Sequence, residues 1–526
     1  MKNKTLYPVY LALAVCVGII VGMLFNFPGK GLALNSQSKR EQKVRQIISF
    51  IDNEYVDSVN TDSLLDETVS SLLQQLDPHS TYIPRSEVLA NQEAISGSFV
   101  GIGIEFKLFK DTLTVVRVIA EGPSARAGLQ SGQRILRADT TSLTGPAVSN
   151  KKVIQTLKGK SGTPVQLEVY DPLQSRTLSL TVRRGEVPVN SVPSAFNLND
   201  TVGYLKLTKF TQRSTQELRQ ALKRLKADGA KHLILDLRDN PGGLLTAAEE
   251  IADEFLDDDQ LIVFTKNRKG VKTEVFASRK GLFQEGKVAV LINEASASAS
   301  EIVAGALQDN DRGVIVGRRS FGKGLVQEEI TLSDGSRMRL TTQRYYTPSG
   351  RSIQKDFDHY NQDFLKQHNF HGQLPIDTAQ KQGQSFNTKG GRTVYGGGGI
   401  APDITIEQDS ASYNRLLYHL VMTVNLDQLA FTYVDVHRDS LQDLTVANFA
   451  ENFTVNEKVL NYFTQGQSLK QLSPQYEEEL PLVKNRIKSF IAYNLLGSDA
   501  YQRVYAQEDL YLSKALEAMQ KPVLSP

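Results

Sequence analysis

The spacing of apolar residues changes several times along this 526-residue chain, and each change marks a region. Apolar side chains at residues 44–51 and 64–76 recur at helical intervals, so we expect a helical region over 38–95. The next stretch, 96–186, has short alternating segments separated by glycine-marked turns. This pattern predicts a compact β-rich domain with one helix at about 149–157.

Strands and helices alternate between residues 187 and 407, which argues for an α/β core. Within it, the polar, glycine-rich and aromatic stretch 356–399 is expected to be an exposed insertion. Helical spacing returns over 408–526, where a domain for oligomerisation or partner binding and a scaffold packed on the core are both open interpretations. We expect core strands at 202–207, 233–237, 288–292 and 339–346, and core helices at 215–227 and 247–255.

The N-terminus, residues 1–28, has the character of a membrane segment. Lys2 and Lys4 precede an apolar run from Leu6 to Phe27, and about 20 apolar residues suffice for a helix to cross a bilayer. Positive residues before the run predict that the short N-terminus stays in the cytoplasm. We favour a retained transmembrane helix because the run is long and no clear small-x-small cleavage site follows it. A cleaved signal peptide is the alternative.

Composition narrows the classes of function. Lysine and arginine number 60 against 58 for aspartate and glutamate, so nothing indicates an electrostatic binder of nucleic acid. The hydrophobic content of 40% is ample for packed cores. Cys16 is the single cysteine, which excludes an intramolecular disulfide.

The candidate chemistry begins after the strand expected over 288–292. A turn of small residues follows, and then a helix whose first turn carries Glu301, so a serine in that turn lies near the positive end of a helix. Downstream, Lys323 stands between two glycines, with Gln327 four residues further on. A serine on a strand-to-helix turn and a lysine in a confined loop are the groups that a serine–lysine hydrolase needs.

A second turn, Asn240-Pro241-Gly242-Gly243, follows the strand expected over 233–237. Its glycines let the chain bend tightly and expose backbone N–H groups. Beside the N–H of the residue after the nucleophile, such a turn can hold the oxyanion of an acyl-transfer intermediate. Each feature alone has an ordinary structural interpretation, but together they favour a catalytic site.

Taken in order, these segments resemble the carboxy-terminal processing proteases, also called tail-specific proteases, over roughly residues 41–407. The resemblance implies an α/β and β multidomain protein, with a crotonase-like α/β serine-protease core and an inserted PDZ domain. The matching segments are 203–207 (Gly-Tyr-Leu-Lys-Leu), 235–243 (Leu-Asp-Leu-Arg-Asp-Asn-Pro-Gly-Gly), 296–301 (Ser-Ala-Ser-Ala-Ser-Glu), 321–324 (Phe-Gly-Lys-Gly) and 398–403 (Gly-Gly-Ile-Ala-Pro-Asp).

Carried over by position, the resemblance implies a role for each residue of the site. Ser298 matches the nucleophile, Lys323 the general base and Gln327 the residue that orients the lysine. The Ala299 N–H and the turn at Gly242 and Gly243 would form the oxyanion hole, and which glycine donates stays open. No metal, nucleotide or redox cofactor is implied.

The lysine must meet one chemical demand. A free lysine has a pKa of about 10.4, so burial or a nearby positive group has to lower the pKa of Lys323 before it can act as a base at neutral pH. None of the histidines stands in a recognisable nucleophile-activating context. We interpret His79 as a turn residue, and His368 and His371 as loop residues and not as a metal pair. The histidines are His79, His232, His359, His368, His371, His419 and His437.

The domain over 96–186 is similar to the PDZ domains embedded in this family. PDZ domains add an extended peptide as a strand and hold its terminal carboxylate on backbone N–H groups. Residues 100–103 would bind the carboxylate, with Ile102 and Ile104 facing an apolar side chain of the substrate tail. Lys158 stands where some relatives that couple peptide binding to activation carry arginine, which leaves that coupling open. The expected binding residues are Val100, Gly101, Ile102, Gly103 and Ile104.

The resemblance implies a serine endopeptidase that recognises the C-terminal tails of proteins or peptides and cleaves through an acyl-enzyme. With the anchor, it predicts a single-pass protein of the bacterial inner membrane with periplasmic catalytic domains, or a free periplasmic protein if the N-terminal segment is cleaved. The helices over 38–95 would serve dimerisation or substrate gating, or only support the fold. A second copy of the chain, in a homodimer, and an activating adaptor protein are possible partners. The alternatives are a catalytically silent PDZ scaffold or chaperone, and a crotonase acting on acyl-thioesters.

Overall fold

The computed structural model describes residues 13, 15, 39–278, 280–357, 383–406, 415–441 and 443–520. The predicted anchor, except for Leu13 and Val15, lies outside these residues, as do His368 and His371. Within the described ranges, no helix combines the length and the apolar character that a bilayer crossing requires. The chain divides into two compact units, Met1–Leu72 and Leu73–Pro526.

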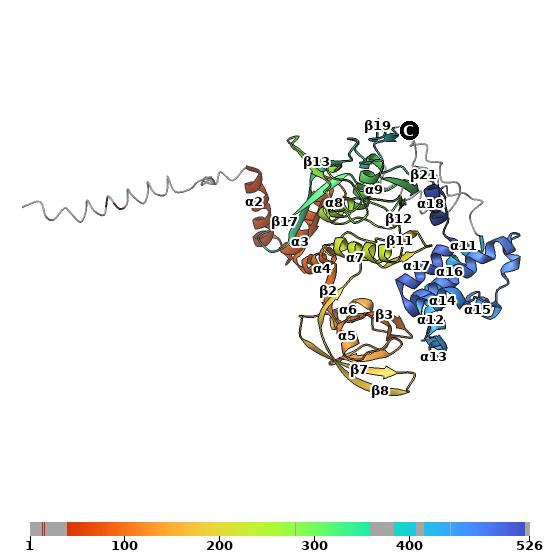
Figure 1. The fold of residues 1–526 in the computed structure, drawn as a ribbon. Coiled ribbons are helices and arrows are strands. Elements are labelled where there is room, and N and C mark those ends of the chain that lie inside the picture. Colours follow the sequence, from red (N-terminus) through yellow and green to blue (C-terminus); the bar gives the residue numbers. More distant parts are fainter. Residues whose placement is uncertain are drawn as a thin grey trace, which may run out of the picture. The chain divides into compact units, whose positions relative to one another are not determined.

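The first unit contains α2 (Lys39–Glu54) and most of α3 (Thr61–Gln74), drawn in red to orange in Figure 1. Both helices coincide with the helical spacing of apolar residues in the sequence. None of the residues of α2 is buried, and Val44, Ile47 and Phe50 are exposed. The apolar positions that predict this helix therefore do not form a core of their own.

The second unit is built around a six-stranded sheet with the order β10-β11-β12-β15-β16-β21. β10 is antiparallel to β11, whereas the other neighbouring strands run parallel. Because parallel strands end at the same edge, the turns after β12 and β15 lie side by side. The strands are β10 (Ser194–Asn197), β11 (Val202–Lys206), β12 (His232–Asp236), β15 (Val288–Ile292), β16 (Gly313–Gly317) and β21 (Ile404–Thr405).

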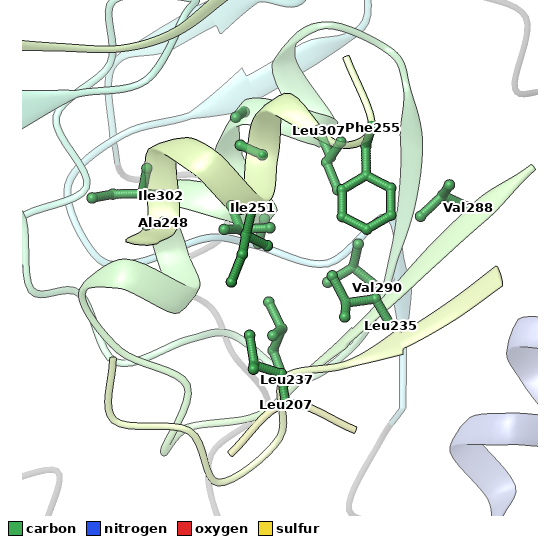
Figure 2. Packing of buried hydrophobic residues seen from close by; sticks show 14 of the residues in the cluster. Leu207, Leu235, Leu237, Ala248, Ile251, Phe255, Val288, Val290, Ile302 and Leu307 are labelled. Carbon is green, nitrogen blue, oxygen red and sulfur yellow. The ribbon is translucent and has the colours of Figure 1, made fainter. Parts of the chain in front are cut away.

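Helices cover one face of this sheet. Leu235 and Val290 on the strands pack in one cluster with Ile251, Phe255 and Leu307 of the helical layer, as Figure 2 shows. The positions of the predicted core helices agree with the structure to within two residues at each end. The covering helices are α7 (Ser214–Ala227), α8 (Leu245–Asp253) and α9 (Ala299–Asp309).

The opposite face is covered by α18 (Leu510–Gln520), near the end of the chain. Tyr204, Ile234 and Leu291 lie in one buried cluster with Leu512 and Met519. A parallel sheet covered on both faces needs strands that are apolar on both sides, which accounts for the continuous apolar run of β15. The helix α18 thus packs on the core, in line with one of the two interpretations left open for residues 408–526.

A second, antiparallel sheet brings further segments to the same region. β18 pairs with β1, β13 and β17, and β13 pairs with β14. Arg339 pairs with Thr81 of β1 and with Glu329 of β17, so these two strands lie on opposite sides of β18. The strands are β1 (Thr81–Ile83), β13 (Leu261–Asn267), β14 (Lys272–Phe276), β17 (Leu325–Thr331) and β18 (Arg337–Tyr346).

The β-rich domain follows α4 (Arg85–Ser96) and has its own core. Gly103 adopts φ 76° and turns the chain between the strands β2 and β3. β2 pairs with β9, whereas β3 pairs with β4. The elements are β2 (Ser98–Gly101), β3 (Ile104–Phe109), β4 (Thr112–Val118), α5 (Pro123–Arg126), β5 (Arg134–Ala138), β6 (Thr141–Ser142), α6 (Asn150–Leu157), β7 (Pro164–Asp171), β8 (Arg176–Arg183) and β9 (Gly185–Pro188).

The C-terminal region is helical, as predicted, and it contacts the β-rich domain. Lys107 of β3 forms an ion pair with Asp427 at 2.8 Å, and the Arg117 guanidinium of β4 donates to the Tyr493 carbonyl at 2.6 Å. A small hairpin of β19 (Ser385–Asn387) and β20 (Thr393–Tyr395) precedes this region. The helices before α18 are α11 (Arg415–Thr423), α12 (Leu426–Val436), α13 (Arg438–Leu441), α14 (Val446–Asn452), α15 (Glu457–Phe463), α16 (Tyr476–Leu496) and α17 (Ser498–Tyr505).

The packing of β12 leads to a stability prediction. Leu235 is fully buried between the sheet and its helices, so Leu235→Ala should lower the free energy of unfolding by about 2–5 kcal/mol through lost burial and the cavity left behind. Leu89→Ala is the control, because Leu89 is 67% exposed on α4 and its loss should change stability by less than about 0.5 kcal/mol. Urea unfolding followed by circular dichroism measures both. Equal effects in the two variants would contradict the packing described here.

Candidate active site

Ser298 lies on a sharp turn between β15 and α9. It is the N-cap residue of α9, with φ 55° and ψ −114°, a backbone conformation that serine rarely adopts. Such strain persists only where the surrounding structure holds it, and it is concentrated at functional sites. The Ser298 N–H donates to Oε2 of Glu301 at 2.8 Å, and the Tyr345 hydroxyl donates to the Ser298 carbonyl at 3.2 Å. Ser298 is therefore held through both its backbone N–H and its backbone carbonyl.

Glu301 connects the serine turn to the lysine loop. Its carboxylate is fully buried, and its Oε2 accepts the backbone N–H of Ser298 at 2.8 Å and that of Lys323 at 2.9 Å. Its Oε1 accepts the Ser320 hydroxyl at 2.6 Å and the Gly322 N–H at 2.7 Å. Burial raises the pKa of Glu301, and these hydrogen bonds oppose part of that rise. One carboxylate oxygen thus holds the main chains of both predicted dyad residues.

The environment of Lys323 suits a base. Burial lowers the pKa of the Lys323 amine and the positive charge of Arg339 lowers it further, while Glu301 and Asp77 oppose part of this shift. Within the part of the chain that the structure describes, no carboxylate forms an ion pair with the Lys323 ammonium. Glu301 binds the backbone of Lys323 and not its amine. The pKa of the amine is therefore shifted in the direction that a general base needs.

Gln327 lies on β17, the strand that follows the lysine loop. Its amide nitrogen donates to the Thr341 hydroxyl at 3.3 Å, so the hydrogen bond that the structure gives it leads to β18 and not to Lys323. The Thr341 N–H in turn donates to the Ser80 hydroxyl at 3.2 Å. This contact joins the glutamine to a segment that the sequence analysis did not assign to the site.

That segment, Asp77 to Ser80, lies beside the lysine. Asp77 accepts the backbone N–H groups of His79 and Ser80, both at 2.8 Å, which makes His79 a turn residue as predicted. Burial and the charge of Lys323 also lower the pKa of His79 to about 4, against the opposing effect of Asp77. The imidazole is therefore neutral at physiological pH. The sequence signal was the Asp-Pro-His-Ser run, but nothing local to it indicates a contact with a lysine 244 positions later.

The glycine turn after β12 lies against the serine turn. A Cβ on Gly242 would lie 2.9 Å from both the Ala299 nitrogen and the Ser298 Cβ, so only glycine fits there. The Ala297 N–H and the Ser300 hydroxyl both donate to the Asn240 carbonyl, at 3.0 and 2.9 Å. The predicted oxyanion-hole residues Gly242 and Ala299 are thus neighbours.

The two glycines differ in how their N–H groups are used. The Gly242 N–H donates to the Asn240 side-chain oxygen at 2.9 Å. Phe210 forms backbone hydrogen bonds with the Gly242 carbonyl and the Leu244 N–H, at 3.0 and 2.9 Å. In this parallel bridge the N–H of Gly243 faces away from Phe210. The Gly242 N–H is occupied within its own turn, whereas the Gly243 N–H is directed outward.

The predicted carboxylate loop lies between β2 and β3. Ile102 is 2% exposed and packs in the core of the β-rich domain, and its carbonyl accepts the Ser124 N–H at 2.8 Å. The Ile102 side chain is part of that core, and its contact with the apolar side chain of a substrate tail stays a prediction. Ile104 is only partly buried. Val100 and Gly101 pair with β9.

Lys158, at the end of α6, contacts the helix before this domain. Its ammonium forms an ion pair with Glu93 of α4 and lies 5.0 Å from the centroid of the Phe99 ring. The residue found in place of an arginine thus keeps a charged link between the β-rich domain and α4.

Comparisons with known proteins agree with these domains. Residues 201–359 match peptidase family S41, residues 100–190 match the PDZ domain, and residues 416–497 match a family of unknown function. The carboxy-terminal-processing protease of Bartonella bacilliformis is 36% identical over 327 residues, which cover 61% of this chain and 74% of that protein. The carboxy-terminal processing protease CtpB of Bacillus subtilis is 30% identical over 333 residues, 62% of this chain and 68% of that protein. A solved photosystem II D1 C-terminal processing protease is 27% identical, covers 70% of this chain and 86% of its own, and has a TM-score of 0.37.

The bonding of Glu301 predicts a specific effect of Glu301→Gln. The glutamine amide nitrogen cannot accept hydrogen bonds, so two of the buried donors now bound to the carboxylate would lose their acceptor. Each unsatisfied donor costs about 1–3 kcal/mol, and the unfolding midpoint should fall accordingly. Thermal unfolding checks this, with Glu285→Gln as the control because Glu285 is outside this network. An unchanged midpoint would show that these bonds contribute nothing to stability.

The charges around Lys323 predict opposite shifts of its pKa. Arg339→Gln removes a positive charge, so the pKa of Lys323 should rise. Asp77→Asn removes a negative charge, so the pKa should fall further, while the asparagine oxygen still caps the turn. The pH dependence of Lys323 acylation by an amine-directed reagent, read by mass spectrometry, measures this, with exposed Lys470 as the internal reference. Shifts of the same sign in both variants would refute the electrostatic account.

Proposed function

The chain belongs to peptidase family S41, with the carboxy-terminal processing proteases, and we propose that it is a serine endopeptidase that uses a serine–lysine mechanism. In this proposal Ser298 is the nucleophile and Lys323 the general base. The observation that supports it most directly is the single oxygen of Glu301 that holds the backbone of both residues. The lowered pKa of Lys323 supports it as well, because only the neutral amine can accept the serine proton.

In the acylation step, the neutral Lys323 amine takes the proton from the Ser298 hydroxyl as its oxygen attacks the scissile carbonyl. The lysine then gives that proton to the leaving amine, and water later hydrolyses the acyl-enzyme with the lysine again as base. Gln327 keeps β17 and the lysine loop in register with β18 through Thr341. The family resemblance supports a direct role for Gln327 in orienting the amine.

The oxyanion is stabilised by backbone N–H groups of the two neighbouring turns. Ala299 supplies one donor at the positive end of α9. Gly243 supplies the other in this proposal, because the Gly242 N–H already donates to Asn240. The close approach of Gly242 to Ser298 keeps both turns within reach of one tetrahedral centre.

Substrates are proteins or peptides with free C-termini, captured by the PDZ domain. A tail adds as a strand and its carboxylate binds backbone N–H groups near residues 100–103, in the manner of PDZ domains. The apolar and positively charged N-terminus supports an anchored protein that faces the periplasm, with cleavage and release into the periplasm as the alternative.

The proposal is tested by cleavage of an unfolded protein that ends in an apolar tail, using the chain from residue 38 onward. Ser298→Ala and Lys323→Ala should each lower kcat by about 10⁴-fold or more, because the two residues act as a unit. The kcat/KM of the parent should rise with pH through the pKa of Lys323, since the deprotonated amine is the active form.

Binding of the tail peptide, measured by fluorescence anisotropy, shows that each variant is folded and that its PDZ domain is intact. If either variant cleaves as fast as the parent, the assignment of the site is wrong. If the parent binds tails and never cleaves them, the chain is a PDZ scaffold that keeps the protease fold. Hydrolysis of acyl-thioesters without peptide cleavage would instead indicate crotonase chemistry.

A further inference from the structure

Asp509 and Tyr511, at the start of α18, contact two arginines that adjoin the candidate catalytic turns, although they lie more than 200 positions from either turn in the sequence. We infer that Asp509 and Tyr511 are positioning residues that hold the glycine turn and the serine turn in their working geometry. The C-terminal segment is then a required part of the peptidase site and not only a cover for the sheet. This inference rests on the proposed function.

Asp509 acts on the glycine turn through Arg238. The Arg238 guanidinium donates to both oxygens of Asp509, at 3.2 and 2.8 Å, and to both oxygens of Asp236, at 2.9 and 2.6 Å. Arg238 is 8% exposed and stands directly before the turn that contains Gly242 and Gly243. A buried guanidinium held by two carboxylates has one allowed position, so the backbone that carries it is fixed as well.

Tyr511 connects Arg238 to the serine turn through Arg318. Its ring centroid lies 4.7 Å from the guanidinium carbon of Arg238 and 5.7 Å from that of Arg318. Arg318 also donates to Glu294 at 2.9 Å, four residues before Ser298. A Cβ on Gly317 would lie 3.0 Å from the Tyr511 ring, so a glycine provides the space for the ring. The Tyr511 ring therefore lies between Arg238, which precedes the glycine turn, and Arg318, which is paired with Glu294 of the serine turn.

The two turns are also joined to each other beside this contact. The Asp239 N–H donates to the Asn293 side-chain oxygen at 3.0 Å, and the Asn293 amide donates to Asp239 at 2.8 Å. Asp239, with φ 62°, and Ser298, with φ 55°, both hold backbone conformations that non-glycine residues rarely adopt. Strained turns need support from outside, and Asp509 and Tyr511 supply it on the side of the sheet that α18 covers.

The first test is Asp509→Asn in the chain from residue 38 onward. The new amide nitrogen cannot accept from Arg238, so the guanidinium is released on one side and the glycine turn moves. We expect kcat to fall by about 10- to 100-fold with KM within about twofold, less than the loss of a whole oxyanion donor. Affinity for a peptide boronate, which forms a tetrahedral adduct on the serine, should fall in parallel.

The matched control is Asp499→Asn. Asp499 lies on α17, bonds Ser194 and Arg503 at 2.8 Å, and touches neither turn, so kcat should stay within about twofold of the parent. Tyr511→Leu removes the aromatic ring and should lower kcat, whereas Tyr511→Phe keeps the ring between the two guanidinium groups and should lower it far less. Asp509→Glu restores the charge and should recover part of the activity.

Hydrogen exchange gives a readout that does not depend on cleavage. Amides of residues 239–243 and 293–299 should exchange faster in Asp509→Asn than in the parent or in Asp499→Asn. Unchanged exchange together with unchanged kcat would overturn the inference, as would equal losses of kcat in Asp509→Asn and Asp499→Asn or a parallel loss of tail binding. If the parent itself never cleaves, the proposed function fails, and the exchange result still decides whether the C-terminal segment holds the turns.

Discussion

A single buried carboxylate determines how the elements of the candidate active site meet. Glu301 accepts the main-chain N–H groups of Ser298 and Lys323 on one oxygen, and its other oxygen accepts donors from Ser320 and Gly322. Burial of a carboxylate without a cation is unfavourable, and convergent donors offset that cost only where all of them are in place. The turn before α9 and the lysine loop are therefore constrained as a pair: neither can move without leaving a buried charge unsatisfied.

Lys323 has to be held in place without an ion pair to its amine. A carboxylate next to the Lys323 amine would raise its pKa and prevent it from acting as a base. Glu301 instead binds the backbone of the lysine, while Arg339 contributes positive charge that lowers the pKa of the amine. Asp77 acts in the opposite direction but is engaged by the Ser80 hydroxyl and backbone. Glu301 thus positions the backbone of Lys323, and its charge opposes only part of the decrease in the pKa of the amine.

The sequence predicted what short-range patterns encode. The strands β12 and β15, the turns after them and the glycine-flanked lysine are contiguous motifs, and the alternation of strands with helices predicted an α/β core. The positive φ of Gly103 left no mark on the apolar alternation, because glycine contributes no side chain to that pattern. His79 and Tyr511 were not connected to the site because their contacts join positions hundreds of residues apart. Nothing local distinguishes an aspartate that caps a turn, such as Asp77, from one that also adjusts a distant lysine.

The edge of the sheet explains why such distant segments converge. Parallel strands deliver two turns side by side, and both turns contain backbone that is unfavourable without outside contacts. β18 contacts the serine turn through Tyr345, and the segment before β1 contacts β18. Asp509, directly before α18, contacts Arg238 beside the glycine turn. The same C-terminal region binds the PDZ domain through Asp427 and Tyr493. The C-terminal region therefore contacts both the PDZ domain and Arg238 beside the glycine turn, so the placement of both depends on this region.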